Sequence, residues 1–145
     1  MILDRRVVPF KRWHYDWLVG RGPHAERDVL VLVNGMVLDT LERANSWTAV
    51  VDGDPVACAG TLQQWPGRHL AWAYITRGTL PLMSWITDEV QRNLAGVKGR
   101  IELTVRKDFP VGQRWARTLG FEVETPLLRA FGPEGEPHVG YVRFN

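Results

Sequence analysis

Glu102 is the side chain of this sequence whose type and setting best suit acid–base chemistry. Glu102 and Thr104 alternate with apolar residues in one strand-like segment, and Tyr74 lies near the end of another. A carboxylate on the polar face of such a strand could act as a general base, directly or through water, and Tyr74 is a second catalytic candidate. The alternative for Glu102 is a structural ion pair with Arg100 or Arg106.

Other kinds of catalytic chemistry find little support in the sequence. Cys58 is the only cysteine and lies between Ala57 and Ala59 inside a strand-like segment, which favours a buried, inert thiol over a nucleophile. No Gly-x-Ser-x-Gly motif is present. The histidines, none of them at metal-ligand spacing, are His14, His24, His69 and His138. We therefore expect neither a metal site nor a Ser-His-Asp triad.

Length and composition predict one soluble domain over residues 1–145. Apolar residues make up 45% and charged residues 23% of the 145 positions, as in globular proteins. A single cysteine excludes an internal disulfide and fits a reducing compartment. No apolar run approaches the roughly 20 residues of a membrane helix. Charges at positions 4–6 come too early for a signal peptide. We expect a protein that is not secreted and has no membrane partner.

The charge pattern argues against nucleic acid as a partner. The formal net charge is only +2, and the basic residues are scattered. A nucleic-acid-binding protein concentrates positive charge on one stripe or arm. The one local basic cluster, within residues 5–12, is flanked by Asp4 and Asp16, as in a solvated face. The seven tryptophans are also spread along the chain, which is typical of core or interface aromatics.

The first half of the chain predicts a strand, two helices and a three-stranded meander. Residues 2–10 read as a strand and residues 11–19 as a short helix. Apolar residues spaced by four predict a second helix over 25–44. The Asp52-Gly53 turn then joins two antiparallel strands. The meander comprises residues 47–51, 56–63 and 69–76.

The second half predicts a helix, a strand, a further helix and a closing hairpin. Thr79 is the expected N-cap of the first helix, and Asp108 caps the second, over 109–119. On that second helix we expect Val111, Trp115 and Leu119 to face the core. The remaining strands are residues 100–105, 121–128 and 139–144. Strand, helix and strand between 69 and 105 predict one parallel crossover in a mixed sheet.

This order resembles the GNAT N-acetyltransferase superfamily. The resemblance rests on residues 103–105 followed by 115–122, which contain the family's Leu-Gly-Phe ending after a strand and a helix. Residues 57–60, 71–76 and 100–102 further resemble a phage-encoded branch of GNAT-like proteins. Some members of that branch are similar to internal virion protein A of podoviruses. The resemblance implies an α/β (α+β) fold with a mostly antiparallel six- or seven-stranded sheet and helices on both faces.

Against the family pattern, the acetyl-CoA site looks degenerate. The family's pyrophosphate loop reads Arg/Gln-x-x-Gly-x-Gly/Ala, whereas Leu80 and Leu82 occupy the small positions and Pro81 lacks an N–H. We expect these leucines to crowd the phosphates and to pack inward. The tyrosine and asparagine common in the family align with Ala116 and Phe109. The residues corresponding to the loop are Ile75, Thr76, Arg77, Gly78 and Thr79.

Two functions follow from the resemblance. The first is a non-catalytic virion or virion-assembly component that needs no cofactor. Its partners would be other phage structural proteins or further copies of the chain, and it would be located in the host cytoplasm, the virion or both. The alternative is an acyl-CoA-dependent N-acyltransferase, which would use acetyl-CoA to modify an amine. In that enzyme Glu102 would deprotonate the amine.

Overall fold

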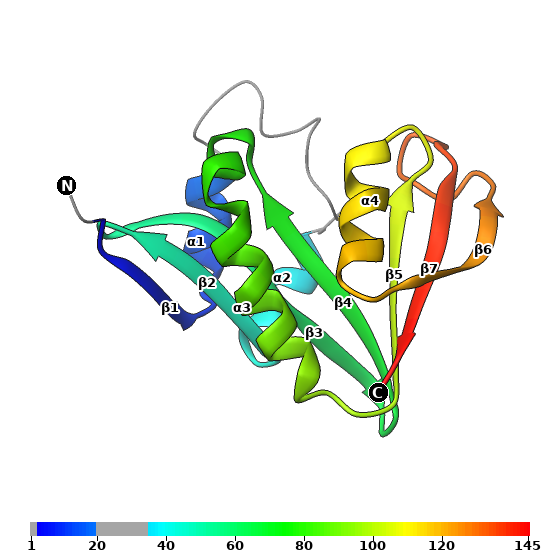
Figure 1. Cartoon of the computed structure of the whole chain (residues 1–145), viewed down its shortest axis with the longest axis horizontal. Helices are drawn as coiled ribbons and strands as arrows, with labels where there is room; N and C mark the ends of the chain where they lie inside the picture. The colour runs from blue at the N-terminus through cyan, green and yellow to red at the C-terminus, as the bar shows by residue number, and fades with distance from the viewer. Residues whose placement is uncertain (1–2, 20–34) are drawn as a thin grey trace.

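A computed structural model describes residues 3–19 and 35–145 (Figure 1). The elements before the crossover are β1 (Arg5–Pro9), α1 (Arg12–Val19), α2 (Gly35–Glu42), β2 (Asn45–Val51), β3 (Asp54–Trp65) and β4 (Arg68–Ile75). The elements after β4 are the 3₁₀ helix η1 (Arg77–Leu82), α3 (Met83–Ala95), β5 (Arg100–Arg106), α4 (Pro110–Thr118), β6 (Glu122–Leu128) and β7 (His138–Phe144). The order of helices and strands is the one that the sequence predicts.

The strands form one seven-stranded sheet in the order β1-β2-β3-β4-β5-β7-β6. Every neighbouring pair is antiparallel except β4 and β5, which are parallel and joined through η1 and α3. The predicted mixed, mostly antiparallel sheet with one parallel crossover is therefore confirmed. β4 and β5 pair over only three residues, from Arg68 opposite Arg100 to Leu70 opposite Glu102. Beyond that point the two strands diverge (Figure 1).

Helices cover both faces of the sheet. α3 and α4 lie on one face, called here the α3–α4 face, and α1 and α2 lie on the other, the α1–α2 face (Figure 1). Alternate residues of the strands feed two separate cores. On the α3–α4 face, Ile75 and Ile101 pack with Ile86 of α3. On the α1–α2 face, Trp72 and Tyr74 of β4 belong to the second core.

Turn chemistry sets the hairpins where the sequence predicts them. Asp52 and Gly53 have φ angles of 50° and 88°, the left-handed pair that a two-residue hairpin between β2 and β3 requires. Gly120 has a φ of 87° directly after α4, where a glycine ends a helix without a Cβ penalty. The two strands of the last hairpin, Glu122–Leu128 and His138–Phe144, follow the predicted ranges closely.

Both predicted helix caps are wrong. Thr79 is not an N-cap: it lies inside η1, its side chain is buried, and its hydroxyl donates to the Val56 carbonyl at 2.7 Å. Asp108 does not cap α4 either, because its carboxylate pairs with Arg106 at 3.1 Å instead. In both places the polar side chain binds another partner, a distant one for Thr79 and a neighbouring one for Asp108. Of the helix expected over 25–44, Gly35–Glu42 is helical, residues 43 and 44 form a turn beyond its end, and residues 25–34 lie outside the described part.

The predicted inward face of α4 is only partly correct. Leu119 is buried, and the indole of Trp115 is half-buried against the core. Val111, however, is 51% exposed, so its placement was wrong. The residues of α4 that face the sheet are Gly112 and Ala116. The row containing positions 111 and 115 therefore lies at the flank of the helix, from which an indole reaches the core and a valine does not.

Candidate functional site

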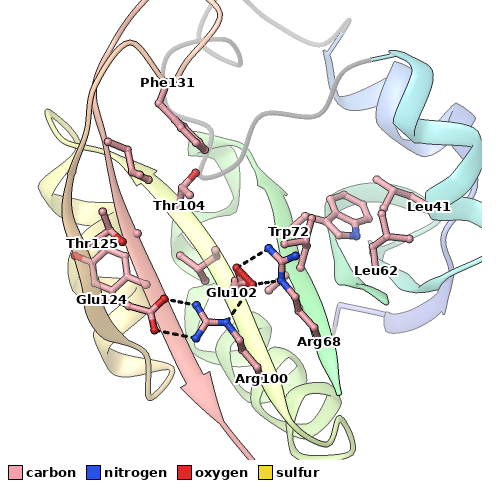
Figure 2. Close-up of a pocket in the computed structure, with 16 residues that line it drawn as sticks. Leu41, Leu62, Arg68, Trp72, Arg100, Glu102, Thr104, Glu124, Thr125 and Phe131 are labelled. Atoms are coloured by element: carbon pink, nitrogen blue, oxygen red, sulfur yellow. Dashed lines mark hydrogen bonds and ion pairs between the residues drawn. The ribbon is translucent and has the colours of Figure 1, made fainter. Parts of the chain in front are cut away.

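A cavity of about 490 Å³ opens on the α1–α2 face where β4 and β5 diverge (Figure 2). Its position follows from the alternation of β5, in which Ile101 and Leu103 belong to the core of the α3–α4 face. Glu102 and Thr104 consequently point to the opposite face and line the cavity. The side chains around it that Figure 2 labels are Leu41, Leu62, Arg68, Trp72, Arg100, Glu102, Thr104, Glu124, Thr125 and Phe131.

Four charged side chains form a network on one wall of the cavity (Figure 2). Arg68 of β4 binds Glu102 through two hydrogen bonds, of 2.5 and 3.0 Å. Arg100 lies with its Nε 3.2 Å from Glu102 Oε2 and donates to Glu124 of β6 at 2.8 Å. The network thus ties β4, β5 and β6 together. Two arginines balance two glutamates, so this wall carries no excess charge.

The network determines what Glu102 can do chemically. The Arg68 hydrogen bonds, with help from Arg100, hold the pKa of Glu102 below its ordinary value. A carboxylate with a lowered pKa is a weaker proton acceptor. The alternative expected for Glu102, an ion pair with Arg100, is confirmed. Arg106 is not its partner, because Arg106 pairs with Asp108.

Tyr74, the second catalytic candidate, lies outside the cavity that Glu102 lines. It is buried beneath α1, opposite Cys58 of β3, and its ring meets that of Tyr15 edge-on at 4.9 Å between centroids. Tyr74 does not line the cavity. The two side chains share a face of the sheet, but the fold does not bring them to one reaction site.

The segment after β4 adopts a shape that differs from a phosphate-binding loop. Residues 77–82 form η1, whose i→i+3 hydrogen bonds use backbone N–H groups internally. The N–H of Thr79 donates to the Thr76 carbonyl at 3.0 Å, and the N–H of Met83 bonds back to Leu80. Pro81 has no N–H to offer. The N–H groups of Thr79 and Met83 are therefore not available to an anion.

Most of the described side chains between positions 75 and 82 pack against the rest of the domain or bond to one another. Ile75 is buried in the core, and the hydroxyls of Thr76 and Thr79 lie 3.1 Å apart. Leu82 packs inward, as expected, but Leu80 does not: it is 57% exposed. A 3₁₀ turn places successive side chains on different sides, so the two leucines cannot both face the core. Arg77 and Gly78 belong to η1, and their side chains lie outside the described part.

Side-chain hydrogen bonds link α3 to α4 on the α3–α4 face. The indole Nε1 of Trp115 donates to Thr87 Oγ1 at 2.9 Å. Gln91 donates to the Thr118 carbonyl at 3.1 Å and accepts from Arg143 at 3.0 Å. Ala116, which occupies the position of the family's tyrosine, is buried and has no polar group. The side chains at positions 80–82 and 116 thus differ from those of the family's pattern.

Three functional-looking side chains escaped the sequence reasoning. Arg68 lies in a turn-like segment and Glu124 in a hairpin strand, and only the strand register brings Arg68 to Glu102 and Glu124 to Arg100. His138 is buried, and its Nδ1 lies 3.1 Å from Thr104 Oγ1. Within the described part of the chain, His138 Nε2 has no hydrogen-bond partner, although Glu136 lies 3.5 Å away. No local spacing marks any of these pairs.

The structure also places Cys58, the only cysteine. Cys58 is fully buried, and desolvation raises its pKa to about 12. Among residues 3–19 and 35–145, no group of histidines, cysteines and acids could hold a metal ion. The same ranges contain no helix long and apolar enough to cross a membrane.

The chain is similar to solved GNAT-family acetyltransferases over nearly its whole length. Ard1 from Thermoplasma volcanium matches with a TM-score of 0.72 and 11% identity, covering 96% of both chains. A GNAT-family acetyltransferase from Streptococcus pneumoniae matches with a TM-score of 0.72 and 10% identity, covering 98% of this chain and 100% of that one. The ribosomal-protein-S18-alanine N-acetyltransferase from Escherichia coli has a TM-score of 0.64 and 15% identity, covering 96% and 92%.

These likenesses define the class of fold. The chain has the GNAT acetyltransferase fold, with a seven-stranded, mostly antiparallel sheet and helices on both faces. No family model and no curated protein matches the sequence. At identities of 10–15% a shared fold does not carry a shared activity. Function has to be argued from the site.

Proposed function

We propose that this chain is a GNAT-fold protein of phage origin that works without acetyl-CoA. It acts as a virion or virion-assembly component, in the host cytoplasm, the particle or both. Its partners are other phage structural proteins or further copies of the chain. The observation that carries the proposal is the conformation of residues 77–82.

A phosphate-binding helix N-terminus needs backbone N–H groups aimed at the ligand. In η1 the N–H groups of Thr79 and Met83 are used in 3₁₀ hydrogen bonds, Pro81 has no N–H, and the Thr79 hydroxyl donates to the Val56 carbonyl. A pyrophosphate oxygen must approach its donors to about 2.9 Å, and these groups are not available to it. This disagreement with the family's loop supports a protein that has lost its cofactor.

Two further features of the structure support the same proposal. The Trp115–Thr87 hydrogen bond links α3 to α4, and the buried methyl group of Ala116 stands where a tyrosine would protonate a leaving thiolate. Glu102, the candidate base, is bound by Arg68 and Arg100. Loop, acid and base therefore all depart from what acetyl transfer needs.

Protein contacts are supported by the outer surface. Several large aromatic side chains are more than half exposed, and aromatic residues are enriched at protein interfaces. These side chains are Trp13, Trp65, Phe131 and Phe144. The phage origin rests on the sequence resemblance of residues 57–60, 71–76 and 100–102 to the phage-encoded branch.

Quantitative mass spectrometry of purified particles tests the proposal. Particles should be prepared from the genome that encodes the chain, with and without an in-frame deletion of its gene. We expect the chain either inside intact particles at a fixed copy number or, if it serves assembly alone, a drop in intact particles after the deletion. Absence from the particles together with normal particle yield would contradict the proposal.

The acyltransferase alternative has one specific observation in its favour. The cavity on the α1–α2 face opens where β4 and β5 diverge, so an amine bound there would lie next to Glu102. A thiol-release assay with acetyl-CoA and a panel of primary amines tests this alternative. Amine-dependent thiol release that is lost in Glu102→Gln would establish it.

A further inference from the structure

A second hollow, called here the basic groove, lies beside the cavity at the end of the sheet where β4 and β5 begin. Its volume is about 750 Å³. It is formed by the end of α2, the end of β3, the β3–β4 turn and the loop between α3 and β5. The residues lining it are Thr40, Arg43, Ala44, Asn45, Thr61, Leu62, Gln63, Pro66, Gly67, His69, Gly96, Val97 and Lys98.

The groove carries positive charge from Arg43 and Lys98, and His69 lines it as well. No aspartate or glutamate of residues 3–19 and 35–145 lines it. Arg43 and Lys98 are exposed, and within residues 3–19 and 35–145 neither side chain forms an ion pair. The wall of the neighbouring cavity differs, because its arginines are paired with glutamates.

The carbonyls at the end of α3 do not cancel this charge. A helix C-terminus is a negative pole, and α3 ends at the groove. The side-chain amide of Asn145, however, donates to the carbonyls of Leu94 and Val97 at 2.7 Å each. These acceptors are thereby satisfied, and the groove keeps its basic character.

The basic groove and the cavity form one continuous surface. Leu62 lines both. Neighbouring residues of α2, Thr40 and Leu41, line the groove and the cavity respectively. The two hollows therefore adjoin at the end of α2 and at Leu62, and His69 of β4 lines the groove from the opposite face of the sheet. An extended segment lying across Leu62 would meet apolar walls on one side and unpaired cations on the other.

We propose that this surface binds an extended acidic segment of a partner protein that carries an apolar anchor side chain. The anchor, aromatic or branched aliphatic, enters the cavity, where Leu41, Trp72 and Phe131 provide apolar contacts. Carboxylates a few residues away pair with Arg43 and Lys98. The proposal rests on the proposed function, action through protein contacts, and names the chemistry of the partner.

In this proposal the apolar anchor and the charged residues of the peptide have different roles. A side chain fully enclosed in an apolar pocket supplies most of the binding energy, while rim charges steer the encounter and select the partner. A nucleic-acid ligand fits less well. Specific DNA binding commonly neutralises six to ten phosphates, about twice or three times what the three basic residues of the groove offer.

Selection from a library of random short peptides, with the full chain as bait, tests the proposal. We expect the enriched peptides to combine aspartate or glutamate with a phenylalanine, tryptophan or leucine. The best of these peptides, labelled with fluorescein, should bind in an anisotropy titration. Its affinity should fall at least about tenfold in the double variant Arg43→Glu with Lys98→Glu, because two attractive contacts become repulsive.

Matched controls separate the two halves of the surface. Arg114→Glu reverses an exposed charge on α4, outside both hollows, and should leave the affinity unchanged. Replacing the peptide's anchor by serine should weaken binding by at least about tenfold and needs no change in the protein. Rising salt concentration should weaken the binding of the acidic peptide and leave the binding of a neutral analogue unchanged.

Several outcomes would overturn the proposal. These are enrichment of basic or uncharged peptides, no enrichment at all, or equal loss of affinity in Arg114→Glu. Binding of a single-stranded DNA oligonucleotide that depends on Arg43 and Lys98, without peptide binding, would reassign the groove to nucleic acid. If particles contain the chain while no acidic peptide binds, this inference fails and the proposed function stands. If amine-dependent acetyl transfer is found, the proposed function fails whatever the peptides do.

Discussion

The two faces of the sheet differ in how open they are. On the α3–α4 face, Trp115 of α4 donates to Thr87 of α3, and the N–H groups of Thr79 and Met83 are used in the 3₁₀ hydrogen bonds of η1. On the α1–α2 face, a cavity of about 490 Å³ stays open, and the basic groove of about 750 Å³ adjoins it at Leu62, at the end of the sheet. Side-chain hydrogen bonds link the helices of the first face, whereas the second face has room for a ligand.

This contrast is what we expect if the fold serves a role other than acetyl transfer, as proposed. Side chains on the α3–α4 face serve the packing of the domain, so filling that face with hydrogen bonds and apolar contacts stabilises the protein. The divergence of β4 and β5 persists because the strands are held only at Arg68–Leu70 and by the ion pairs of Glu102. The hollow that results on the α1–α2 face is then available for a different ligand.

The largest expected effect concerns Cys58, which tests whether the α1–α2 face is closed beneath α1. Burial raises the pKa of this thiol to about 12, and only the thiolate reacts with a disulfide reagent. At about pH 8 the folded protein should react roughly a thousandfold more slowly than the unfolded chain, whose thiol has a pKa near 8.5. Ellman's reagent with and without guanidinium measures this ratio. Similar rates would mean that the cavity extends to Cys58.

Trp115→Ala tests the closure of the α3–α4 face. Removing the half-buried indole and its bond to Thr87 should lower the free energy of unfolding by about 2–4 kcal/mol. Urea denaturation followed by circular dichroism measures it. The matched control is Val111→Ala on the same flank of α4, which should change stability by less than about 0.5 kcal/mol. Equal effects of the two substitutions would mean that Trp115 does not close this face.

Glu102→Gln tests the network that borders the cavity. Loss of the ion pairs with Arg68 and Arg100 should cost about 1–2 kcal/mol at neutral pH. The pKa of Glu102 is lowered in the folded state, so this stabilisation is present above the ordinary carboxyl pKa of about 4. It is lost as the pH falls through the lowered value. The difference between wild type and variant in urea denaturation should therefore shrink in acid, and a difference that grows there would be inconsistent with the network.

Leu80→Ala should have the smallest effect. Leu80 is 57% exposed, so the substitution should change the free energy of unfolding by less than about 0.5 kcal/mol. It should also fail to create acetyl-CoA binding, because the 3₁₀ hydrogen bonds of Thr79 and Met83 and the missing N–H of Pro81 are unchanged. Thermal unfolding and calorimetry measure the two quantities. Acetyl-CoA binding gained by this variant alone would show that side-chain crowding, rather than backbone conformation, closes the site.

The order of elements could be predicted because its signals are local. Asp52-Gly53 forces a hairpin and Gly120 ends a helix through their own φ angles. The predicted caps at Thr79 and Asp108 were wrong because each side chain has a closer partner, Val56 in one case and Arg106 in the other. Local spacing carries no information about such competition.

The site was less predictable because strand register assembles it. Glu102 could be identified as a polar residue on a strand, and its pairing with Arg100 lies two residues away in the sequence. Its pairing with Arg68 and the contact of Thr104 with His138 each span 34 residues. The basic groove likewise gathers Arg43, His69 and Lys98 from three elements. These juxtapositions depend on the sheet order.

Isothermal titration calorimetry with acetyl-CoA tests the central claim, that the α3–α4 face no longer holds the cofactor. The titration should run to about 1 mM ligand on the full chain, with CoA as a second titrant. A formed site would give a dissociation constant near 1 μM, about −8 kcal/mol. Our account predicts no saturable heat over this range, in the wild type and in Leu80→Ala alike. A saturating isotherm with a micromolar dissociation constant would contradict it.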